Sequence, residues 1–524
     1  MLRSIQVRVT PEIAFTPLKL RAYVSTIEDV DINRILNIDI RKRSIDARQR
    51  QVMINLTLEV HIDSVIPASD IPAAETAYRP VSDDAPQAIV VGAGPAGLFA
   101  ALRLIERGIR PVILERGKSV DDRKPDMAAI SRTGHIDPDS NYCFGEGGAG
   151  AFSDGKLYTR SKKRGSVEKI LVTLHQHGAS PDILVDAHPH IGSDKLPDVI
   201  RAIRNTIIRC GGEVHFSSRV DNIIIENGAV KGVRTGDTEW LGPVILATGH
   251  SARDVYRMLS DNNIDMEAKG IAVGVRLEHP QELIDRIFYH SAIGRGKYLP
   301  PAEYSLLTRV GNRGVYSFCM CPGGYIIPAT SQPGLFVSNG MSPASRSTKW
   351  ANSGMVVEIL PDDVDGDDPL RMMHYQEEIE RRFFLDGDGS QNAPAQRMTD
   401  FVAGRSSRDL PASSFTAGIH PARIDRLLPQ PVATRLREAF VEFDKKYHRF
   451  LSPEATVIGC ETRTSAPVRV IREPQTLQHI SCPGLYPAGE GAGYAGGIVS
   501  AAIDGDRCAD ALADALFQTN FLKN

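Results

Sequence analysis

Two glycine-rich segments, far apart in the chain, carry the residues with the clearest chemical meaning. The first follows an apolar run, where Ala88–Val91 leads into the G-x-G-x-x-G pattern of 92–97. Glycines at this spacing allow a tight turn, close approach of the backbone to a pyrophosphate, and close packing of a helix on a strand. A second apolar run ends at Glu115, whose carboxylate is placed to take the ribose hydroxyls of a nucleotide. The alternative is an ordinary glycine-rich turn. The predicted dinucleotide contacts are Gly92, Gly94, Pro95, Ala96, Gly97, Glu115 and Arg116.

The second glycine-rich segment, 484–505, reads GLYPAGEGAGYAGGIVSAAIDG, and a helix is predicted from Ile498 to Leu512. It resembles the C-terminal flavin motif of glutathione-reductase-type FAD proteins, in which the helix N-terminus points at the flavin pyrimidine. Residues 243–249 resemble the A-T-G strand of the same class, and 212–220 resemble its adenine-side strand. Three motifs in this order predict FAD as the cofactor. The implied contacts are Val220, Thr248, Gly249, Gly489, Glu490, Gly496, Gly497 and Ile498.

A third glycine-rich loop, 145–156, has no strand before it, so it does not predict a second dinucleotide site. Its glycines allow close backbone approach to a cofactor, and we predict that Gly147, Gly148 and Ser153 contact FAD. Lys156 is a candidate catalytic residue in this loop. A structural loop on the phosphate side of the cofactor is the alternative.

Arginines and cysteines in the second half of the chain offer further chemistry. Arg463 is the second candidate catalytic residue, because a guanidinium can bind a substrate carboxylate in a bidentate way. A structural ion pair is the alternative for it, as it is for Arg276. Cys319 and Cys321 would point the same way on a strand, where they are either a thiol relay to flavin or buried structural cysteines. No residue spacing predicts a metal site.

Composition sets wide limits on the function. A chain of 524 residues is long enough for two or three domains. The net charge of −3 predicts no general attraction to nucleic acid or anionic membranes, and no apolar run is long enough for a membrane span. Seven scattered cysteines do not resemble a disulfide framework, and MLRSIQVRVT contains no apolar signal core. These features predict a cytoplasmic protein.

The chain divides into three predicted domains in an α/β fold. Residues 1–65 show a β-α-β-β pattern typical of a small ferredoxin-like α+β domain, and 66–87 form a proline-rich linker. A Rossmann-like FAD-binding domain is predicted in two parts, 88–265 and 451–524. An α+β domain at 266–450 is inserted between them and is expected to cover the substrate side of the flavin ring.

Further motifs extend the likeness beyond the cofactor. The chain resembles a family of FAD-dependent dehydrogenases in the glutathione-reductase-type class that carry a small ferredoxin-like N-terminal domain. The resemblance implies the fold and FAD but no particular substrate. The N-terminal helix is less acidic than in that family, so no role of that domain is transferred. The segments that carry the resemblance are FGEGGAGAFSDGKL (144–157), HIGSDKL (190–196), ATGHSARD (247–254), IAVGVRLEHPQ (271–281), FCMCPGG (318–324), SNGMS (338–342) and ETRTSAPVRV (461–470).

The leading hypothesis is an FAD-dependent oxidoreductase that moves a hydride or an electron pair between flavin and a small organic substrate. NAD(P)H, bound transiently, or the substrate itself would be the donor. A second hypothesis is an RNA-modifying flavoprotein, because Arg41, Lys42, Arg43, Arg48 and Arg50 make the N-terminal turn basic. A solvated basic hairpin explains the same residues, so no nucleic-acid partner is predicted. The third hypothesis is a non-catalytic flavin sensor. The sequence does not indicate the oligomeric state.

Overall fold

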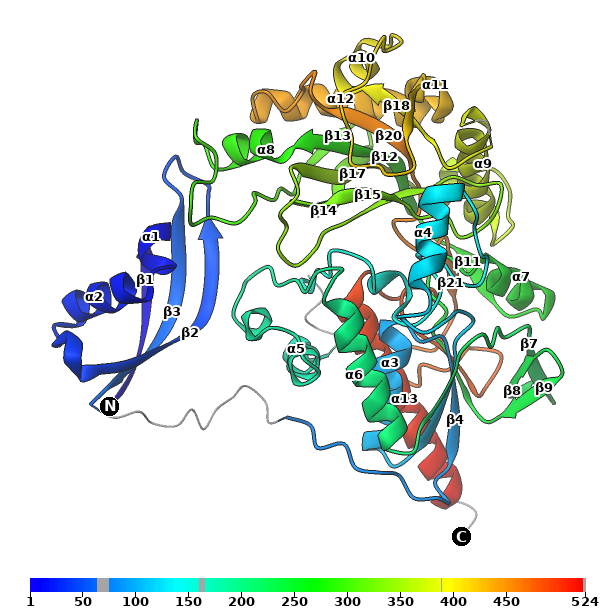
Figure 1. The fold of residues 1–524 in the computed structure, drawn as a ribbon. Coiled ribbons are helices and arrows are strands. Elements are labelled where there is room, and N and C mark those ends of the chain that lie inside the picture. The colour runs from blue at the N-terminus through cyan, green and yellow to red at the C-terminus, as the bar shows by residue number, and fades with distance from the viewer. Residues whose placement is uncertain (64–74, 160–164, 388, 522–524) are drawn as a thin grey trace.

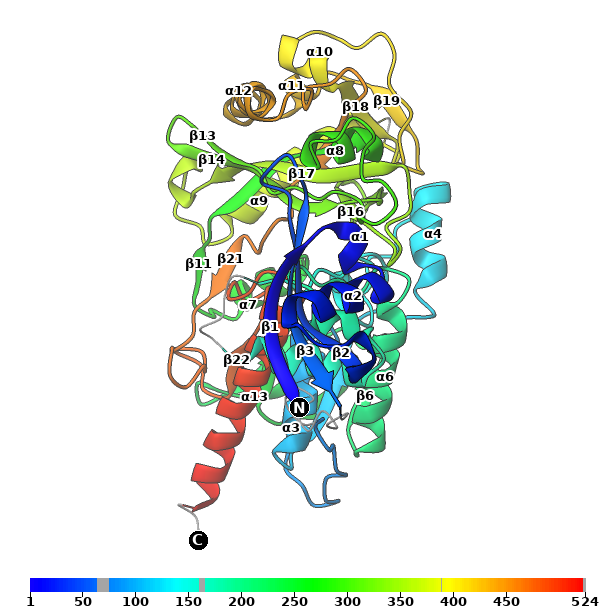
Figure 2. The same cartoon turned by 90° about the vertical axis from the view of Figure 1, so that its left-hand side faces the viewer.

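The computed structural model describes residues 1–63, 75–159, 165–387 and 389–521. Figures 1 and 2 show a nucleotide-binding domain below, an inserted domain above it and a small N-terminal domain at one side. A five-stranded parallel sheet forms the centre of the nucleotide-binding domain, with β4 in its middle. The strands, in spatial order, are β22 (Leu485–Pro487), β10 (Val244–Leu246), β4 (Gln87–Val91), β5 (Arg110–Leu114) and β6 (Glu213–His215).

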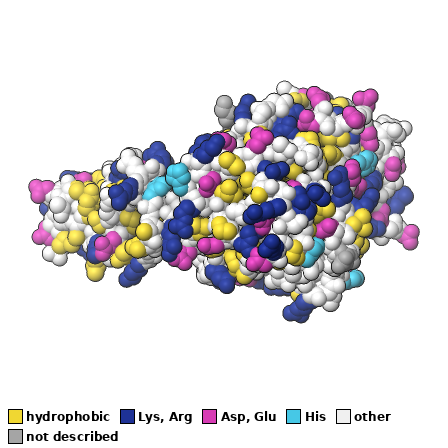
Figure 3. Space-filling model, turned by 90° about the horizontal axis from the view of Figure 1, so that it is seen from above, with side chains coloured by type: hydrophobic (Ala, Val, Ile, Leu, Met, Phe, Trp, Pro, Cys, Tyr) yellow, Lys and Arg dark blue, Asp and Glu magenta, His cyan; other side chains and the backbone are white. Residues whose placement is uncertain are grey.

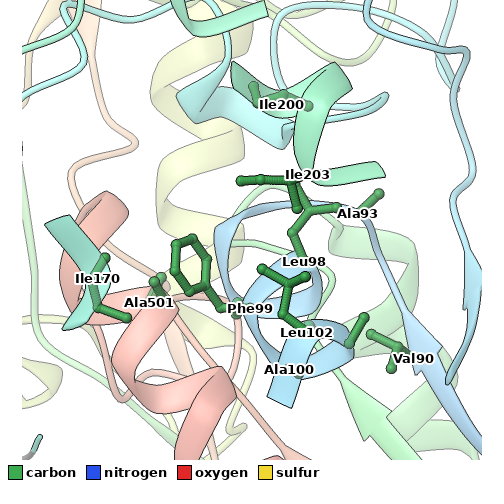
Figure 4. Packing of buried hydrophobic residues seen from close by; sticks show 14 of the residues in the cluster. Val90, Ala93, Leu98, Phe99, Ala100, Leu102, Ile170, Ile200, Ile203 and Ala501 are labelled. Atoms are coloured by element: carbon green, nitrogen blue, oxygen red, sulfur yellow. The ribbon is translucent and has the colours of Figure 1, made fainter. Parts of the chain in front are cut away.

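Four helices pack in the core beside this sheet. They are α3 (Pro95–Glu106), α5 (Val167–Gln176), α6 (Leu196–Arg209) and α13 (Ile498–Phe521). Figure 4 shows Leu98 of α3 beside Ile203 of α6, while Phe99 lies toward Ala501 of α13. A Cβ at Gly505 would lie 2.0 Å from the backbone oxygen of Ala96, so α13 and α3 pack backbone to backbone. The predicted association of the two glycine-rich segments is therefore made by helix packing.

The inserted domain is built on a seven-stranded mixed sheet in the order β13-β14-β17-β12-β20-β18-β19. Its strands are β12 (Ile271–Pro280), β13 (Leu307–Val310), β14 (Arg313–Cys321), β17 (Trp350–Ile359), β18 (Ala393–Arg397), β19 (Ile419–Pro421) and β20 (Thr456–Glu461). The hairpin β15 (Tyr325–Pro328) and β16 (Ser338–Met341) lies toward the nucleotide-binding domain, and α9 (Arg371–Asp386) and α12 (Gln430–Lys446) belong to the same domain.

The predicted boundary at 451 is wrong by one strand. β20 pairs with β12 and β18, so residues 456–461 belong to the inserted sheet. The chain leaves that domain at β21 (Val468–Val470), which pairs with β11 (Met266–Ala268) near the predicted start of the insertion. A buried strand has the same apolar pattern in either sheet, so the sequence could not assign β20 to its partner.

The N-terminal domain has the predicted β-α-β-β order. Its strands β1 (Leu2–Val9), β3 (Met53–Ile62) and β2 (Ile35–Asp46) form an antiparallel sheet in that spatial order, with α1 (Pro11–Ala14) and α2 (Pro17–Glu28) beside it. β2 includes Arg41, Lys42 and Arg43 of the basic segment and ends at Asp46. Residues 66–74 of the predicted linker lie outside the described residues, and 75–86 contain no helix or strand.

The β2–β3 hairpin contacts both larger domains. The Arg43 backbone N–H donates to Val185 O at 3.0 Å, and its guanidinium pairs with Asp186 at 2.6 Å. At the tip of the hairpin, buried Val52 joins the apolar core of the inserted domain, and His290 Nε2 lies 3.0 Å from Ala47 O. The small domain thus bridges the two larger ones.

None of the helices in the described part of the chain combines the length and the apolar character that a membrane span requires. Among the same residues, no group of three or more His, Cys, Asp or Glu side chains is arranged to hold a metal ion.

Candidate cofactor and substrate site

The first glycine loop has the tight form that the spacing predicts. Gly92 has φ 104°, in the region that favours glycine, and a Cβ there would lie 2.6 Å from Ala247 O. A Cβ at Gly97 would lie 1.9 Å from the Gly92 oxygen. Only glycine therefore fits at positions 92 and 97. The turn leads directly into α3, which begins at Pro95, so the N-terminus of this helix lies at the first glycine loop.

Glu115 lies at the end of β5 and joins two loops. Its carboxylate accepts hydrogen bonds from the backbone N–H groups of Ala93 at 2.8 Å, Gly117 at 2.9 Å and Gly145 at 3.0 Å. Carboxylate oxygens can accept further bonds, so the predicted ribose contact stays open to this side chain. The neighbouring Arg116 is paired with Asp139 and Asp254.

The third glycine-rich loop, 145–156, lies against the first and against the start of α13. The Gly147 N–H donates to Ala93 O at 2.8 Å, and a Cβ on Gly148 would lie 3.3 Å from the Gly94 Cα. A Cβ on Gly150 would lie 3.3 Å from Ile498 Cγ1, while Ser153 Oγ donates to Gly150 O at 2.8 Å. The structure therefore brings this loop to the place where the other two segments meet.

The C-terminal segment completes the cradle. A Cβ on Gly489 would lie 2.7 Å from the Ala96 Cβ, and one on Gly491 would lie 2.5 Å from the Gly249 oxygen. Gly496 and Gly497 are exposed, and a Cβ on either would meet no atom within 4 Å. The N-terminus of α13 thus opens into free space beside tightly packed backbone, an arrangement that fits a flat, anionic prosthetic group.

Of the remaining predicted contacts, Thr248 adjoins Gly92, where an added Cβ would lie 3.4 Å from the Thr248 Cα. Val220 is buried among the apolar residues of β4 and β5. Glu490 is half-buried, and this burial raises the pKa of its carboxyl to about 7, while the N–H of Gly497 works against the increase.

A pocket lies between the two larger domains, next to these loops. Ala149 and Ser153 line the pocket from the third glycine-rich loop, and His250 lines it directly after the A-T-G motif. Asn339 and Arg463 line it from the inserted domain. The other lining residues are Tyr142, Cys143, Phe152, Ile327, Ala329, Val337, Ser338, Gly340 and Glu461. The pocket is therefore bordered by the loops assigned to the cofactor and closed by the inserted domain.

Arg463 reaches the pocket, but most of its hydrogen-bonding capacity is used within the protein. Its guanidinium binds both oxygens of Glu380, at 3.2 and 3.0 Å, and Glu380 also binds Arg253 at 2.7 and 2.8 Å. The two arginines lower the pKa of buried Glu380 to about 2. Arg463 therefore lies in a buried ionic triad with Glu380 and Arg253. This agrees with the alternative that Arg463 forms a structural ion pair.

Lys156 has a similar position at the edge of the site. Its Nζ lies 3.2 Å from Asp154 Oδ2 and donates to Met320 O of the inserted domain. Asp154 also binds Arg346 of the inserted domain at 2.7 Å, and the two cations lower the pKa of Asp154 to about 2. Lys156 does not line the described pocket, so the structure places it beside the site rather than in it.

Two pocket residues have strongly shifted pKa values, and only that of Glu461 lies near neutral pH. Burial raises the pKa of Glu461 to about 7, although its partner Arg276, with Nη1 3.2 Å from both carboxylate oxygens, works against the increase. Burial and the neighbouring arginines 463 and 253 lower the pKa of His250 to about 4, so this imidazole is neutral near pH 7. His250 and Asn339 were not predicted as site residues, although both lie in motifs that carry the family resemblance.

Comparison with known proteins agrees with this geometry. Residues 86–129 match a family model described as an FAD binding domain, and 270–464 match one described as an FAD-dependent protein, C-terminal domain-like. A protein of Clostridium beijerinckii, described as an uncharacterized protein, is 41% identical over 497 residues, which is 92% of each chain. The chain belongs to a family of FAD-dependent flavoproteins. FAD is its cofactor.

Other matches to this flavoprotein are more distant. Protein FixC of Salmonella typhi is 26% identical over 229 residues, covering 40% of this chain and 47% of that one. Among solved structures, a geranylgeranyl bacteriochlorophyll reductase-like protein of Thermoplasma acidophilum has 15% identity and a TM-score of 0.34, covering 83% of this chain and 80% of its own. The flavin-dependent brominase Bmp2 has 12% identity and a TM-score of 0.37, with 82% and 79% covered. Residues 1–61 match a model described as a domain of unknown function.

Proposed function

We propose that this flavoprotein is an oxidoreductase that moves a hydride or an electron pair between FAD and an organic substrate held in the interdomain pocket. The observation that carries the proposal is that residues of two cofactor loops, Ala149 and His250, share this pocket with Asn339 of the inserted domain. A substrate bound there would lie against the cofactor loops on one side and against the inserted domain on the other.

The residues of the chain would divide the work. FAD, when bound, supplies the two-electron chemistry. The free N–H groups at the start of α13 would stabilise negative charge that develops on the pyrimidine side of the ring, by about 1 kcal/mol, which is roughly 20 mV for a two-electron couple. Glu461 is placed to hold or release a proton at its carboxylate, because its pKa is raised to about 7. The apolar lining, including Phe152 and Val337, would exclude water.

Anaerobic mixing tests the proposal. The purified holoprotein would be mixed separately with NADH, with NADPH and with fractions of a metabolite pool. The flavin absorbance at about 450 nm would be recorded in each mixture. Bleaching by one of them identifies the donor. No bleaching by any of them would favour the non-catalytic sensor instead.

A pocket variant makes this test specific. Ala329 is buried and lines the pocket from the inserted domain, so Ala329→Phe would fill space on the substrate side. FAD would stay bound, but reduction by the substrate would slow. Leu307→Phe, at an exposed position on β13 of the same sheet, is the matched control and should behave as wild type. Equal reduction rates in both variants would place the substrate elsewhere.

The RNA hypothesis finds no support in the comparisons or in the charge arrangement. Arg41 pairs with Glu59, Arg43 with Asp186, and Arg48 with Asp46. Figure 3 shows basic and acidic side chains mixed on the face that includes the N-terminal domain. Three basic side chains of this turn thus form ion pairs, and the pair of Arg43 with Asp186 joins two domains.

A further inference from the structure

The C-x-C pair lies in a distorted part of β14. Phe318 pairs with Gly354 of β17, and Cys321 pairs with Asn352. Two residues on β14 therefore lie between these pairs, opposite one residue on β17. The extra residue makes a β-bulge, and Cys319 within it has φ 45°, in the left-handed region that few residues other than glycine adopt. Strained backbone of this kind is concentrated at functional sites.

Cations and a thiol converge on this bulge. Arg276 Nη2 donates to Cys319 O at 2.7 Å and lies 3.4 Å from Cys321 Sγ. Lys156 Nζ donates to the next carbonyl, Met320 O. The buried Cys321 thiol donates to Cys319 O at 3.3 Å. The Cys321 thiol lowers the pKa of Cys319, and the nearby cations Lys156 and Arg276 add to this effect. The neighbouring Cys319 thiolate and burial raise the pKa of Cys321.

The bulge lies next to the cofactor and substrate site. Arg276 also binds Glu461, which lines the pocket. Cys319 lies close enough to Glu461 and Glu490 that its negative charge raises the pKa of both carboxyls. Cys319 is also partly exposed. Charged and titratable groups from five elements act on Cys319. They are Lys156 and Asp154 from the third glycine-rich loop, Arg276 from β12, Cys321 from β14, Glu461 from β20 and Glu490 from the C-terminal flavin segment.

We propose that Cys319 and Cys321 form a redox-active dithiol that exchanges two electrons with the FAD of this site, an inference that rests on the proposed function. Cys319 supplies the thiolate and Cys321 the thiol. In the oxidising direction an S–S bond forms between them, the Cys321 S–H bond breaks, and two electrons and one proton pass to oxidised flavin, which becomes the anionic reduced form. A disulfide across one intervening residue is strained and easily reduced, as a reversible couple requires.

Alkylation of the full-length holoprotein tests the thiolate without using enzyme activity. Iodoacetamide labelling between about pH 6 and pH 9 would be mapped by mass spectrometry, with N-acetylcysteine in the same mixture as the reference thiol. The labelling rate of an ordinary thiol falls about tenfold for each pH unit below its pKa, so N-acetylcysteine should show that decline and Cys319 should not. Lys156→Met should move the Cys319 profile to higher pH, whereas exposed Lys349→Met should not. A Cys319 profile that follows that of N-acetylcysteine, or no labelling of Cys319, would overturn the assignment.

Counting electrons tests the couple itself. Holoprotein oxidised with diamide would be titrated anaerobically with dithionite while the flavin absorbance is followed. Wild type and Cys210→Ser should take about four electrons per FAD, and Cys321→Ser about two. About two electrons in all three would refute the dithiol, while flavin bleaching by a physiological donor would leave the proposed function intact. A correctly folded protein that holds no flavin would instead refute the proposed function.

Discussion

Glu461 should make the stability of the inserted domain depend on pH, and replacing it with glutamine should remove that dependence. Its pKa is raised from 4.5 to about 7, mainly by burial. Because the folded-state pKa lies above the unfolded one, the fold favours the neutral carboxyl. This stabilisation is complete below about pH 4.5 and is lost as the pH rises through about 7.

The size of the effect follows from the shift. The increase of the Glu461 pKa from 4.5 to about 7 corresponds to a total of about 3.4 kcal/mol. Between about pH 5 and pH 8, linkage gives a loss of about 2.5 kcal/mol that Glu461→Gln should not show. Glutamine cannot ionise, so any effect it has on the packing around Arg276 is the same at every pH, and the pH-dependent part of the difference isolates the titration of Glu461.

Tryptophan fluorescence can follow this domain alone. The chain has two tryptophans, Trp240 in the nucleotide-binding domain and Trp350 at the start of β17, which pairs with the β12 strand that carries Arg276. In a Trp240→Phe background, urea unfolding of Trp350 would be compared for wild type and Glu461→Gln from about pH 5 to pH 8. Glu454→Gln, at an exposed site just before β20, is the matched control and should follow wild type. If the difference between wild type and Glu461→Gln stays constant across this range, the burial argument for Glu461 is wrong.

Three further predictions test the cradle, the ionic triad and the N-terminal contact. Gly97→Ala should abolish FAD retention on gel filtration, because its Cβ would lie 1.9 Å from a backbone oxygen, whereas Gly314→Ala, with no atom nearer than 3.9 Å, should stay yellow. Glu380→Ala should lower the free energy of unfolding in urea by about 3–5 kcal/mol, because two buried guanidinium groups lose their counter-ion; an unchanged urea midpoint would contradict this. Val52→Asp should release the N-terminal hairpin from the inserted domain and speed proteolysis within residues 75–86, whereas Ile45→Asp, at an exposed position, should not; equal cleavage of both would argue against the contact.

Local sequence patterns were sufficient for the parts of the fold that depend on local geometry. The glycines at 92 and 97 have a distinct signature because no other residue fits a turn whose own oxygen lies so close. The parallel order of the strands on either side could also be predicted. An apolar run before a glycine turn and another after the following helix form a strand–helix–strand unit, whose two strands are parallel. The loop at 145–156 is predicted to contact the cofactor from its distance after Glu115 together with its resemblance to related flavoproteins, and the structure brings it against the first glycine loop.

Pairings between distant segments could not be predicted in this way. Arg463 was identified as a candidate because of its type, but its partner Glu380 lies on α9, and nothing in either segment indicates the other. The pKa of Glu461 depends on burial between two sheets and on Arg276, both of which are tertiary properties. Burial and partner choice decide whether a charged residue binds a substrate or stabilises the fold, and a single sequence reports neither.

The ion pairs around the pocket also limit how a substrate can enter it. Arg253 of α7 (Arg253–Asp261), in the nucleotide-binding domain, binds Glu380 of the inserted domain, and Asp154 binds Arg346 in the same way across the boundary. Both pairs are buried, and separating the two domains would break the charge-assisted hydrogen bonds of each of them. Wide opening of the two domains would therefore be rare, because both pairs would have to break together. We expect substrates to enter by movement of side chains at the rim of the pocket, with the inserted sheet held in a fixed position over the cofactor loops.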